Sequence, residues 1–306
     1  MRILVTGASG LLGINLALEA SRDHQVFGLV NNHRLHSTAF QVVDGDLLIP
    51  GTAERLLEAI QPDWVIHCAA LANLDACEAD PVRACQINTE VPRLLARLVA
   101  RSGARLLHVS TDSVFDGLRG DYTEEDIPSP VGVYSQTKLA AEQAVTEADP
   151  HAIVARVNLF GYSMTSKRSL GEFFLYNLQA GKQVMGFTDV IFCPLLVNDL
   201  AQIFIEMLTA GLTGLYHVVS SDCISKYEFG VKLARRFSLD AALIQPTTVA
   251  QGGLKAVRSP KLNLRSDKLS GTLKHPLPTI TSGLGRYYQL YQSGYPDLIR
   301  QMSTQA

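Results

Sequence analysis

The sequence predicts an α/β fold built on a doubly wound parallel sheet, with a smaller and partly interleaved C-terminal lobe. Two features of the 306 residues predict it. Through the first half, short and continuously apolar runs alternate with longer amphipathic runs. Continuous apolar character is typical of strands buried on both faces of a parallel sheet. The alternation itself implies right-handed crossovers between successive strands.

The predicted strands and helices of the first half follow one another along the chain. The strands are expected at residues 2–6, 25–31, 39–46, 63–70, 104–111 and 152–157. The helices are expected at residues 11–22, 54–60, 92–103 and 134–145. Gly103 ends the third helix, because glycine readily adopts the left-handed conformation found at helix C-termini.

The regular alternation stops near residue 165. Helices are expected at 169–181 and 196–211, and each ends at a glycine. A strand at 216–220 and a helix at 225–237 follow. Many of the prolines lie in the remaining tail, which is expected to form short elements only.

Composition and charge exclude several classes of protein. The chain is 47% hydrophobic and 18% charged, and its net charge is -2. That charge gives no electrostatic basis for binding nucleic acid or an anionic membrane. No apolar run reaches the ~20 residues that a membrane span needs, and the N-terminus has no signal-peptide pattern. We therefore expect a cytoplasmic protein with neither a nucleic-acid nor a membrane partner.

The cysteine and histidine patterns predict neither a disulfide nor a metal site. The cysteines are odd in number and no pair has C-x-x-C spacing, so we expect free thiols in a reducing compartment. They are Cys68, Cys77, Cys85, Cys193 and Cys223. His33 and His36 lie in a predicted loop without nearby acidic residues, whereas zinc usually has three or four ligands.

A glycine-rich turn joins the first predicted strand to the first helix. Thr6, Gly7, Gly10 and Gly13 form the pattern T-G-x-x-G-x-x-G. In a Rossmann fold such glycines permit the tight turn, the approach of the backbone to a pyrophosphate, and the packing of helix on sheet. The free N–H groups and the dipole of the helix stabilise the phosphates. The turn therefore predicts a dinucleotide site, to which Ser9, Leu11 and Leu12 also belong.

The end of the second strand bears on the choice between NAD and NADP. An acidic residue there would bind the ribose hydroxyls of NAD, but the chain has Asn31 and, three residues on, Arg34. A guanidinium can pair with a 2′-phosphate, so NADP is favoured and NAD stays open. An ordinary polar loop is the alternative. Asp46, followed by Leu47, could accept from the adenine amino group or cap a helix.

A tyrosine and a lysine four residues apart predict the reaction. Tyr134 and Lys138 share one side of a predicted helix. A nearby ammonium group is expected to lower the pKa of the phenol, which can then exchange a proton with a carbonyl oxygen while a hydride moves at the carbon. The lysine can also hold the ribose of a nicotinamide. Ser110 and Thr111, at the end of the fifth strand, can hydrogen-bond the substrate oxygen or can simply satisfy backbone groups.

Several motifs match one known family. Residues 110–117 read STDSVFDG, 122–126 carry Y-x-E-x-D, and 134–138 carry Y-x-x-T-K. Cys68-Ala69-Ala70 replaces an N-A-A motif, and Asn88 matches the asparagine of V-N-x-x-x. Together these residues resemble the extended short-chain dehydrogenase/reductase superfamily, and most of all the dTDP-4-dehydrorhamnose reductase family.

The resemblance implies roles for these residues. Catalysis falls on Thr111, Tyr134 and Lys138, and Asn88 is expected to support the lysine. The implied substrate is a keto nucleotide sugar, and a homodimer is plausible. The implied organisation is a nucleotide-binding Rossmann domain over 1–165, to which 187–212 returns, and a remainder over 166–306 that is mainly a substrate-binding lobe.

The chain departs from this family on the substrate side. The Q-x-G-x-P-T motif reads VIFCPL at 190–195, so only its proline matches. The aromatic residue after the sixth strand is expected to be Leu159 or Phe160. The R-P motif has become Arg258-Ser259-Pro260.

Three functions are compatible with these residues. The leading one is an NADP-linked reductase of a 4-keto nucleotide sugar. A nucleotide-sugar epimerase or dehydratase is the second, although Ser113 stands where the related dehydratases carry a glutamate base. The third is a partner protein that binds NADP, like the regulatory subunit of methionine adenosyltransferase.

Overall fold

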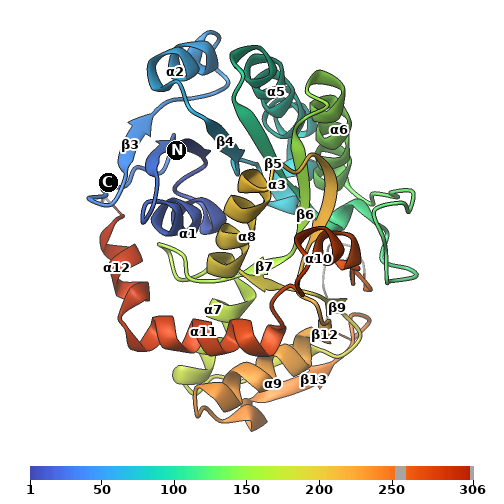
Figure 1. Ribbon diagram of the computed structural model, residues 1–306. Coiled ribbons are helices and arrows are strands. Elements are labelled where there is room, and N and C mark those ends of the chain that lie inside the picture. The colour runs from blue at the N-terminus through green and yellow to red at the C-terminus, as the bar shows by residue number, and fades with distance from the viewer. Residues whose placement is uncertain (252–259, 304–306) are drawn as a thin grey trace.

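A parallel sheet forms the centre of the molecule in the computed structural model, which describes residues 1–251 and 260–303 (Figure 1). Its strand order is β11-β6-β5-β4-β1-β2-β3, and every neighbouring pair is parallel. The sheet strands are β1 (Arg2–Thr6), β2 (Gln25–Val30), β3 (Gln41–Asp44), β4 (Trp64–His67), β5 (Arg105–Thr111), β6 (Ile153–Val157) and β11 (Gly214–Val218). The strand order reverses at β1 and β4, where doubly wound folds bind their ligands.

Helices cover both faces of the sheet. One face packs against α2 (Thr52–Ile60), α5 (Val91–Ser102) and α6 (Val133–Ala148). The other face packs against α1 (Leu11–Ala20) and α8 (Val197–Thr209), which also contact each other. The fold class predicted from the alternating apolar runs is therefore confirmed.

The other described elements lie at the carboxyl end of the sheet and in the lower lobe of Figure 1. Between β4 and α5 lie α3 (Leu74–Ala79), α4 (Pro81–Cys85) and a π-helical turn, η1 (Gln86–Glu90). The remaining strands are β7 (Leu159–Phe160), β8 (Val184–Phe187), β9 (Ile191–Phe192), β10 (Leu195–Leu196), β12 (Ile224–Ser225) and β13 (Ile244–Thr247). The remaining helices are η2 (Asp112–Val114), α7 (Leu170–Gln179), α9 (Lys226–Arg236), η3 (Ala241–Leu243), α10 (Asp267–Leu273), α11 (Ile280–Gln292) and α12 (Tyr295–Gln301).

The tail corrects the expectation of short elements only. Helix α11 runs for 13 residues, and Thr279 caps it by accepting a hydrogen bond from the backbone of Ser282. Its buried side includes Tyr287, whose ring stacks on Tyr162 with the ring centres 3.9 Å apart. The helix therefore joins the main core. The 187–212 segment, which is expected to return to the Rossmann domain, contains α8, and just beyond it β11 pairs with β6.

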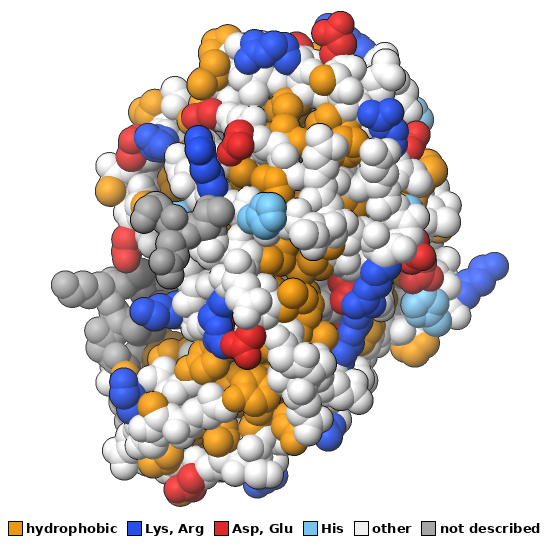
Figure 2. All heavy atoms as spheres, turned by 90° about the vertical axis from the view of Figure 1, so that its left-hand side faces the viewer, with side chains coloured by type: hydrophobic (Ala, Val, Ile, Leu, Met, Phe, Trp, Pro, Cys, Tyr) orange, Lys and Arg blue, Asp and Glu red, His pale blue; other side chains and the backbone are white. Residues whose placement is uncertain are grey.

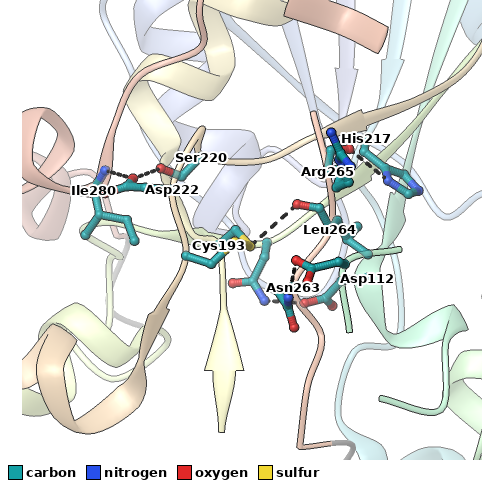
Figure 3. Close-up of a disulfide and its surroundings, with 12 residues drawn as sticks. Asp112, Cys193, His217, Ser220, Asp222, Asn263, Leu264, Arg265 and Ile280 are labelled. Atoms are coloured by element: carbon teal, nitrogen blue, oxygen red, sulfur yellow. Dashed lines mark hydrogen bonds between the residues drawn. A yellow bond between two sulfur atoms is a disulfide. The ribbon is translucent and has the colours of Figure 1, made fainter. Parts of the chain in front are cut away.

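Cys193 and Cys223 form a disulfide, so the expectation of free thiols is wrong for these two residues (Figure 3). In the antiparallel pair of β9 and β12, Phe192 lies opposite Ile224. Cys193 follows Phe192 and Cys223 precedes Ile224, so the two cysteines are next in the same register and directly face each other. The other three cysteines are free thiols.

Loss of this disulfide should destabilise the protein. Closing a loop across a separation of 30 residues is expected to stabilise the fold by about 2–4 kcal/mol. Cys223→Ser should therefore lower the free energy of unfolding by that amount in urea titrations, whereas Cys85→Ser, an exposed free thiol, should change it little. Five titratable thiols in the denatured, unreduced protein would contradict the disulfide.

The surface and the helices agree with the bulk properties of the sequence. On the described part of the face in Figure 2, Lys and Arg side chains are interspersed with Asp and Glu side chains, consistent with the net charge of -2. Among the described residues, no helix has both the length and the apolar character needed to cross a membrane.

Candidate active site and cofactor cavity

The glycine-rich turn has the geometry of a phosphate cradle. Gly7 has φ +68°, and a Cβ there would lie 2.8 Å from the backbone of Ala69. A Cβ on Gly13 would lie 2.1 Å from the carbonyl oxygen of Gly7. Gly10 precedes α1 and provides no side-chain cap. The first turn of α1 therefore presents N–H groups that an anion can approach closely.

A cavity of about 250 Å³ opens beside this turn, at the carboxyl ends of β1, β2, β3 and β4. Nine residues expected from the sequence to bind a cofactor line it: Gly7, Ser9, Gly10, Asn31, Asp46, Leu47, Cys68, Ala69 and Ala70. Other residues line it without having been expected: Asn32, His33, Leu48, Arg83, Ile87, Val91 and Arg168. Arg83 and Arg168 come from segments far along the chain, so no local sequence pattern points to them.

Arg34 does not line this cavity. Its side chain is 77% exposed, and its Nε lies 3.7 Å from a carboxylate oxygen of Asp44, at the end of β3. Asp46 does line the cavity, but its carboxylate accepts a hydrogen bond from the backbone of Leu48. It caps a local turn rather than α2, which begins only at Thr52.

Tyr134, in the first turn of α6, lines a second cavity of about 530 Å³. Thr111, at the end of β5, hydrogen-bonds the phenol, and burial raises the pKa of Tyr134 to about 12. The expectation that the neighbouring ammonium lowers this pKa is thus wrong. The reason is the direction of Lys138, whose Nζ donates to the carbonyl oxygen of Val109 at 2.6 Å and lies 3.2 Å from Nε2 of His108.

Lys138 is buried, and it has neighbours that line each of the two cavities. Burial lowers the pKa of its ammonium to about 8, while Glu142 and Cys68 act in the opposite direction. Cys68 lines the cofactor cavity, and Tyr134, one turn before Lys138, lines the larger cavity. Lys138 itself is 2% exposed and is not part of the lining of either cavity.

Ser110 and Asn88 make hydrogen bonds that hold together the strands and helices around the site. The Ser110 hydroxyl donates to Glu142 at 2.5 Å, in a buried ion pair of Glu142 with Arg156, so it points away from both cavities. Asn88 bonds both backbone groups of Leu71 and donates to the hydroxyl of Thr137 at 3.1 Å. The expectation that Asn88 supports Lys138 is corrected: it holds the chain after β4 against α6.

The larger cavity includes residues that the sequence did not single out. Its lining combines charged, polar and apolar groups: Leu74, Asp75, Glu78, Asp112, Ser113, Val131, Gly132, Tyr134, Ser135, Asn158, Val190, Ile191, Phe192, Lys226 and Leu262. Asn158 donates to the carboxylate of Asp112, which is 4% exposed and has a pKa raised by burial. Both face the cavity because they follow adjacent strands of the sheet.

The segments that depart from the family motifs have distinct positions. Val190, Ile191 and Phe192 line the larger cavity, and the disulfide follows directly. Phe160 is fully buried against Phe229 and Tyr287, away from the cavity. Of the altered R-P motif, residues 258 and 259 lie outside the described residues.

Comparisons with known proteins agree with this architecture. The family model for the RmlD substrate binding domain matches residues 1–293. The chain is 31% identical to the "Probable low-salt glycan biosynthesis reductase Agl14" of Haloferax volcanii, over 93% of this chain and 96% of that one. It is 34% identical to the dTDP-4-dehydrorhamnose reductase of Mycobacterium tuberculosis, over 84% of this chain and 83% of that protein.

One relative has a different printed role, and one solved structure shows the fold. The chain is 32% identical to rat methionine adenosyltransferase 2 subunit beta, over 81% of this chain and 75% of that one. A crystal structure of a dTDP-4-dehydrorhamnose reductase from Clostridium acetobutylicum matches with a TM-score of 0.82 and 25% identity. That match covers 95% of this chain and all of the other.

Proposed function

Because the chain belongs to the RmlD substrate binding domain family of extended short-chain dehydrogenase/reductases, we propose that it is an NADPH-dependent reductase of a keto nucleotide sugar. The proposed substrate is most similar to that of the dTDP-4-dehydrorhamnose reductases. One observation carries the proposal: Tyr134 lines the larger cavity with its phenol hydrogen-bonded to Thr111, and one helical turn on, Lys138 interacts with Cys68, which lines the cofactor cavity.

The residues of the smaller cavity fit a dinucleotide. The uncapped start of α1 and the cradle at Gly7 suit a pyrophosphate, and a Cβ on Gly13 would collide with this turn. Asn31, Asn32 and His33 place hydrogen-bonding groups and no carboxylate at the end of β2, which suits a phosphorylated ribose. When bound, the dinucleotide supplies the hydride that adds to the substrate carbonyl carbon.

Tyr134 is the proton donor of the proposed reaction. With a pKa near 12, its phenol is protonated at neutral pH and can donate to the oxygen on which negative charge develops. Thr111 fixes the phenol and can hydrogen-bond the same oxygen. Lys138, with a pKa near 8, is mostly protonated at neutral pH and would help to hold the nicotinamide ribose of the bound dinucleotide.

The proposed function is tested by loss of NADPH absorbance. The purified protein is mixed with NADPH and each of a panel of 4-keto nucleotide sugars. Turnover on at least one sugar is the expected result. Tight NADPH binding without turnover on any sugar would count against a reductase of this class.

A separate prediction concerns the effect of two arginines on cofactor affinity. Arg168 lines the cofactor cavity, and Arg34 does not. Arg168→Ala should weaken NADPH and NADH alike, by about 5–10-fold, if its guanidinium reaches the shared pyrophosphate. Arg34→Ala should change NADPH affinity by less than about threefold, because Asp44 holds that side chain outside the cavity. Fluorescence titration measures both. A larger, NADPH-specific loss for Arg34→Ala would place the 2′-phosphate on Arg34 instead.

A regulatory role is the second candidate. The 32% identity to methionine adenosyltransferase 2 subunit beta favours it, since that relative is named as a subunit of another enzyme. Stable co-elution with a second enzyme, together with NADPH binding and no turnover, would support this role. Turnover of a keto nucleotide sugar at ordinary enzymatic rates would remove the need for a regulatory role.

A further inference from the structure

Three polar side chains form a buried row across the centre of the sheet. Thr6 pairs in register with His67, and His67 pairs with His108, so the row runs from β1 through β4 to β5. All three are at most 1% exposed. Leu4, Val65 and Leu106, two residues earlier on the same strands, pack with α5 and α6, so the row points toward those helices.

The row ends at Lys138. The two imidazole rings stack with their centres 5.4 Å apart and their planes at 23°. His67 shares a hydrogen bond of 2.7 Å with Thr6, which also accepts from the backbone of Ala69 beside the cofactor cavity. At the other end, Nε2 of His108 lies 3.2 Å from Nζ of Lys138.

In the contact between Lys138 and His108, the chemistry of the two groups determines which is the hydrogen-bond donor. An ammonium group has hydrogens and no lone pair, so Lys138 donates and Nε2 of His108 accepts. His108 is therefore neutral and carries its proton on Nδ1. Burial first, then Lys138 and His67, keep the pKa of His108 well below its ordinary value, so the imidazole stays an acceptor throughout the neutral pH range.

If this polar row served only to fill the core, it would lower the stability of the fold. Nε2 of His67 and Nδ1 of His108 are buried and have no hydrogen-bond partner among the described residues. Unpartnered buried polar atoms cost stability, and apolar side chains could fill the same space without this cost. The presence of His67 and His108 in the core is therefore explained by a role beyond packing.

We propose that His108 is a positioning residue for Lys138: as a neutral acceptor, it holds the ammonium group, together with the carbonyl of Val109, where that group can meet the cofactor ribose. The inference rests on the proposed function. Three other titratable groups interact with the ammonium and remain in any His108 variant: Glu142 on α6, and His67 and Cys68 at the end of β4.

Two substitutions of His108 separate positioning from packing. In His108→Gln, the side-chain amide can place an oxygen close to the position of Nε2, whereas His108→Leu keeps bulk and removes the acceptor. The leucine variant should lose at least tenfold in kcat while its KM for the keto sugar changes less than threefold, and the glutamine variant should recover most of the kcat. His217→Leu, which removes another buried histidine outside both cavities, controls for general destabilisation.

The pH dependence gives a readout that packing does not affect. A hydrogen bond to the ammonium favours its charged form, so its loss lowers the pKa of Lys138. The basic limb of kcat against pH should therefore move to lower pH in His108→Leu and stay in place in His108→Gln and His217→Leu. Wild-type kcat and an unshifted profile in His108→Leu would overturn the proposal, as would equal impairment of the two His108 variants.

Titration with NADPH allows the role of His108 to be tested even if the proposed function fails. If the wild-type protein binds NADPH but reduces no sugar, the proposed function fails, and titration still decides the role of His108. His108→Leu should then bind NADPH at least threefold more weakly than His108→Gln, with affinity falling at lower pH than in wild type. Equal affinities and equal pH dependence would overturn the inference alone.

Discussion

Tyr134→Phe is expected to reduce turnover of the keto sugar by about 10²–10⁴-fold while NADPH affinity stays within a few-fold of wild type. The substitution removes the proton donor and keeps the ring. The phenol lines the larger cavity and not the cofactor cavity, so its loss leaves the lining of the cofactor cavity unchanged. Steady-state kinetics and fluorescence titration of NADPH measure the two effects separately.

A second tyrosine provides the control for this experiment. Tyr288→Phe removes a phenol on α11 that accepts a hydrogen bond from Gln292, outside both cavities. It should retain wild-type kcat and KM. A Tyr134→Phe enzyme with wild-type turnover would show that another group donates the proton, and Thr111 would then be the next candidate.

Glu142→Gln is expected to lower the free energy of unfolding by about 3–5 kcal/mol. Glu142 and Arg156 form an ion pair of 2.7 Å between α6 and β6, with side chains only 7% and 3% exposed. Glutamine leaves the arginine charge buried without a counter-charge. It also removes the charged acceptor of the Ser110 hydroxyl, which holds β5 to α6 below the active site.

Two further variants identify the cause of this loss. Glu147→Gln, on an exposed position of the same helix, should change the free energy of unfolding by less than about 0.5 kcal/mol. The double variant Glu142→Leu/Arg156→Met should regain much of the stability, because it removes both buried charges. Urea denaturation measures all three, and an unchanged midpoint for Glu142→Gln would contradict a buried, structurally important ion pair.

The parts of the fold that follow from local sequence were predicted correctly. The glycines at 7 and 13 specify a turn whose close approaches any side chain would prevent, and the apolar runs specify the strands around it. Tyr134 and Lys138 lie on one helix, α6, as their spacing predicts. Such features depend on a few neighbouring residues, so a single sequence contains the information.

The errors concern features that depend on tertiary contacts. Cys193 meets Cys223 only because β9 and β12 pair in one register, which no spacing rule reveals. Helix α11 contains glycines that reduce helix propensity, and burial of Tyr287 outweighs them.

Side-chain direction is the other source of error. Arg34 has the right sequence position for a 2′-phosphate, yet its side chain lies against Asp44. Lys138 was expected to act on the phenol, whereas its ammonium is directed to Val109 and His108. Neither direction follows from the order of residues, because each depends on atoms from a neighbouring strand.

The central claim, that this chain transfers hydride to the carbonyl carbon of a keto nucleotide sugar, is tested most directly with NADPH that carries deuterium at the transferable position of the nicotinamide. The product is analysed by mass spectrometry and NMR. The account predicts one deuterium on the former carbonyl carbon of the sugar in wild type, and label that accumulates about 10²–10⁴-fold more slowly in Tyr134→Phe. Tight binding of the labelled NADPH with no deuterium in any sugar of the panel would contradict it.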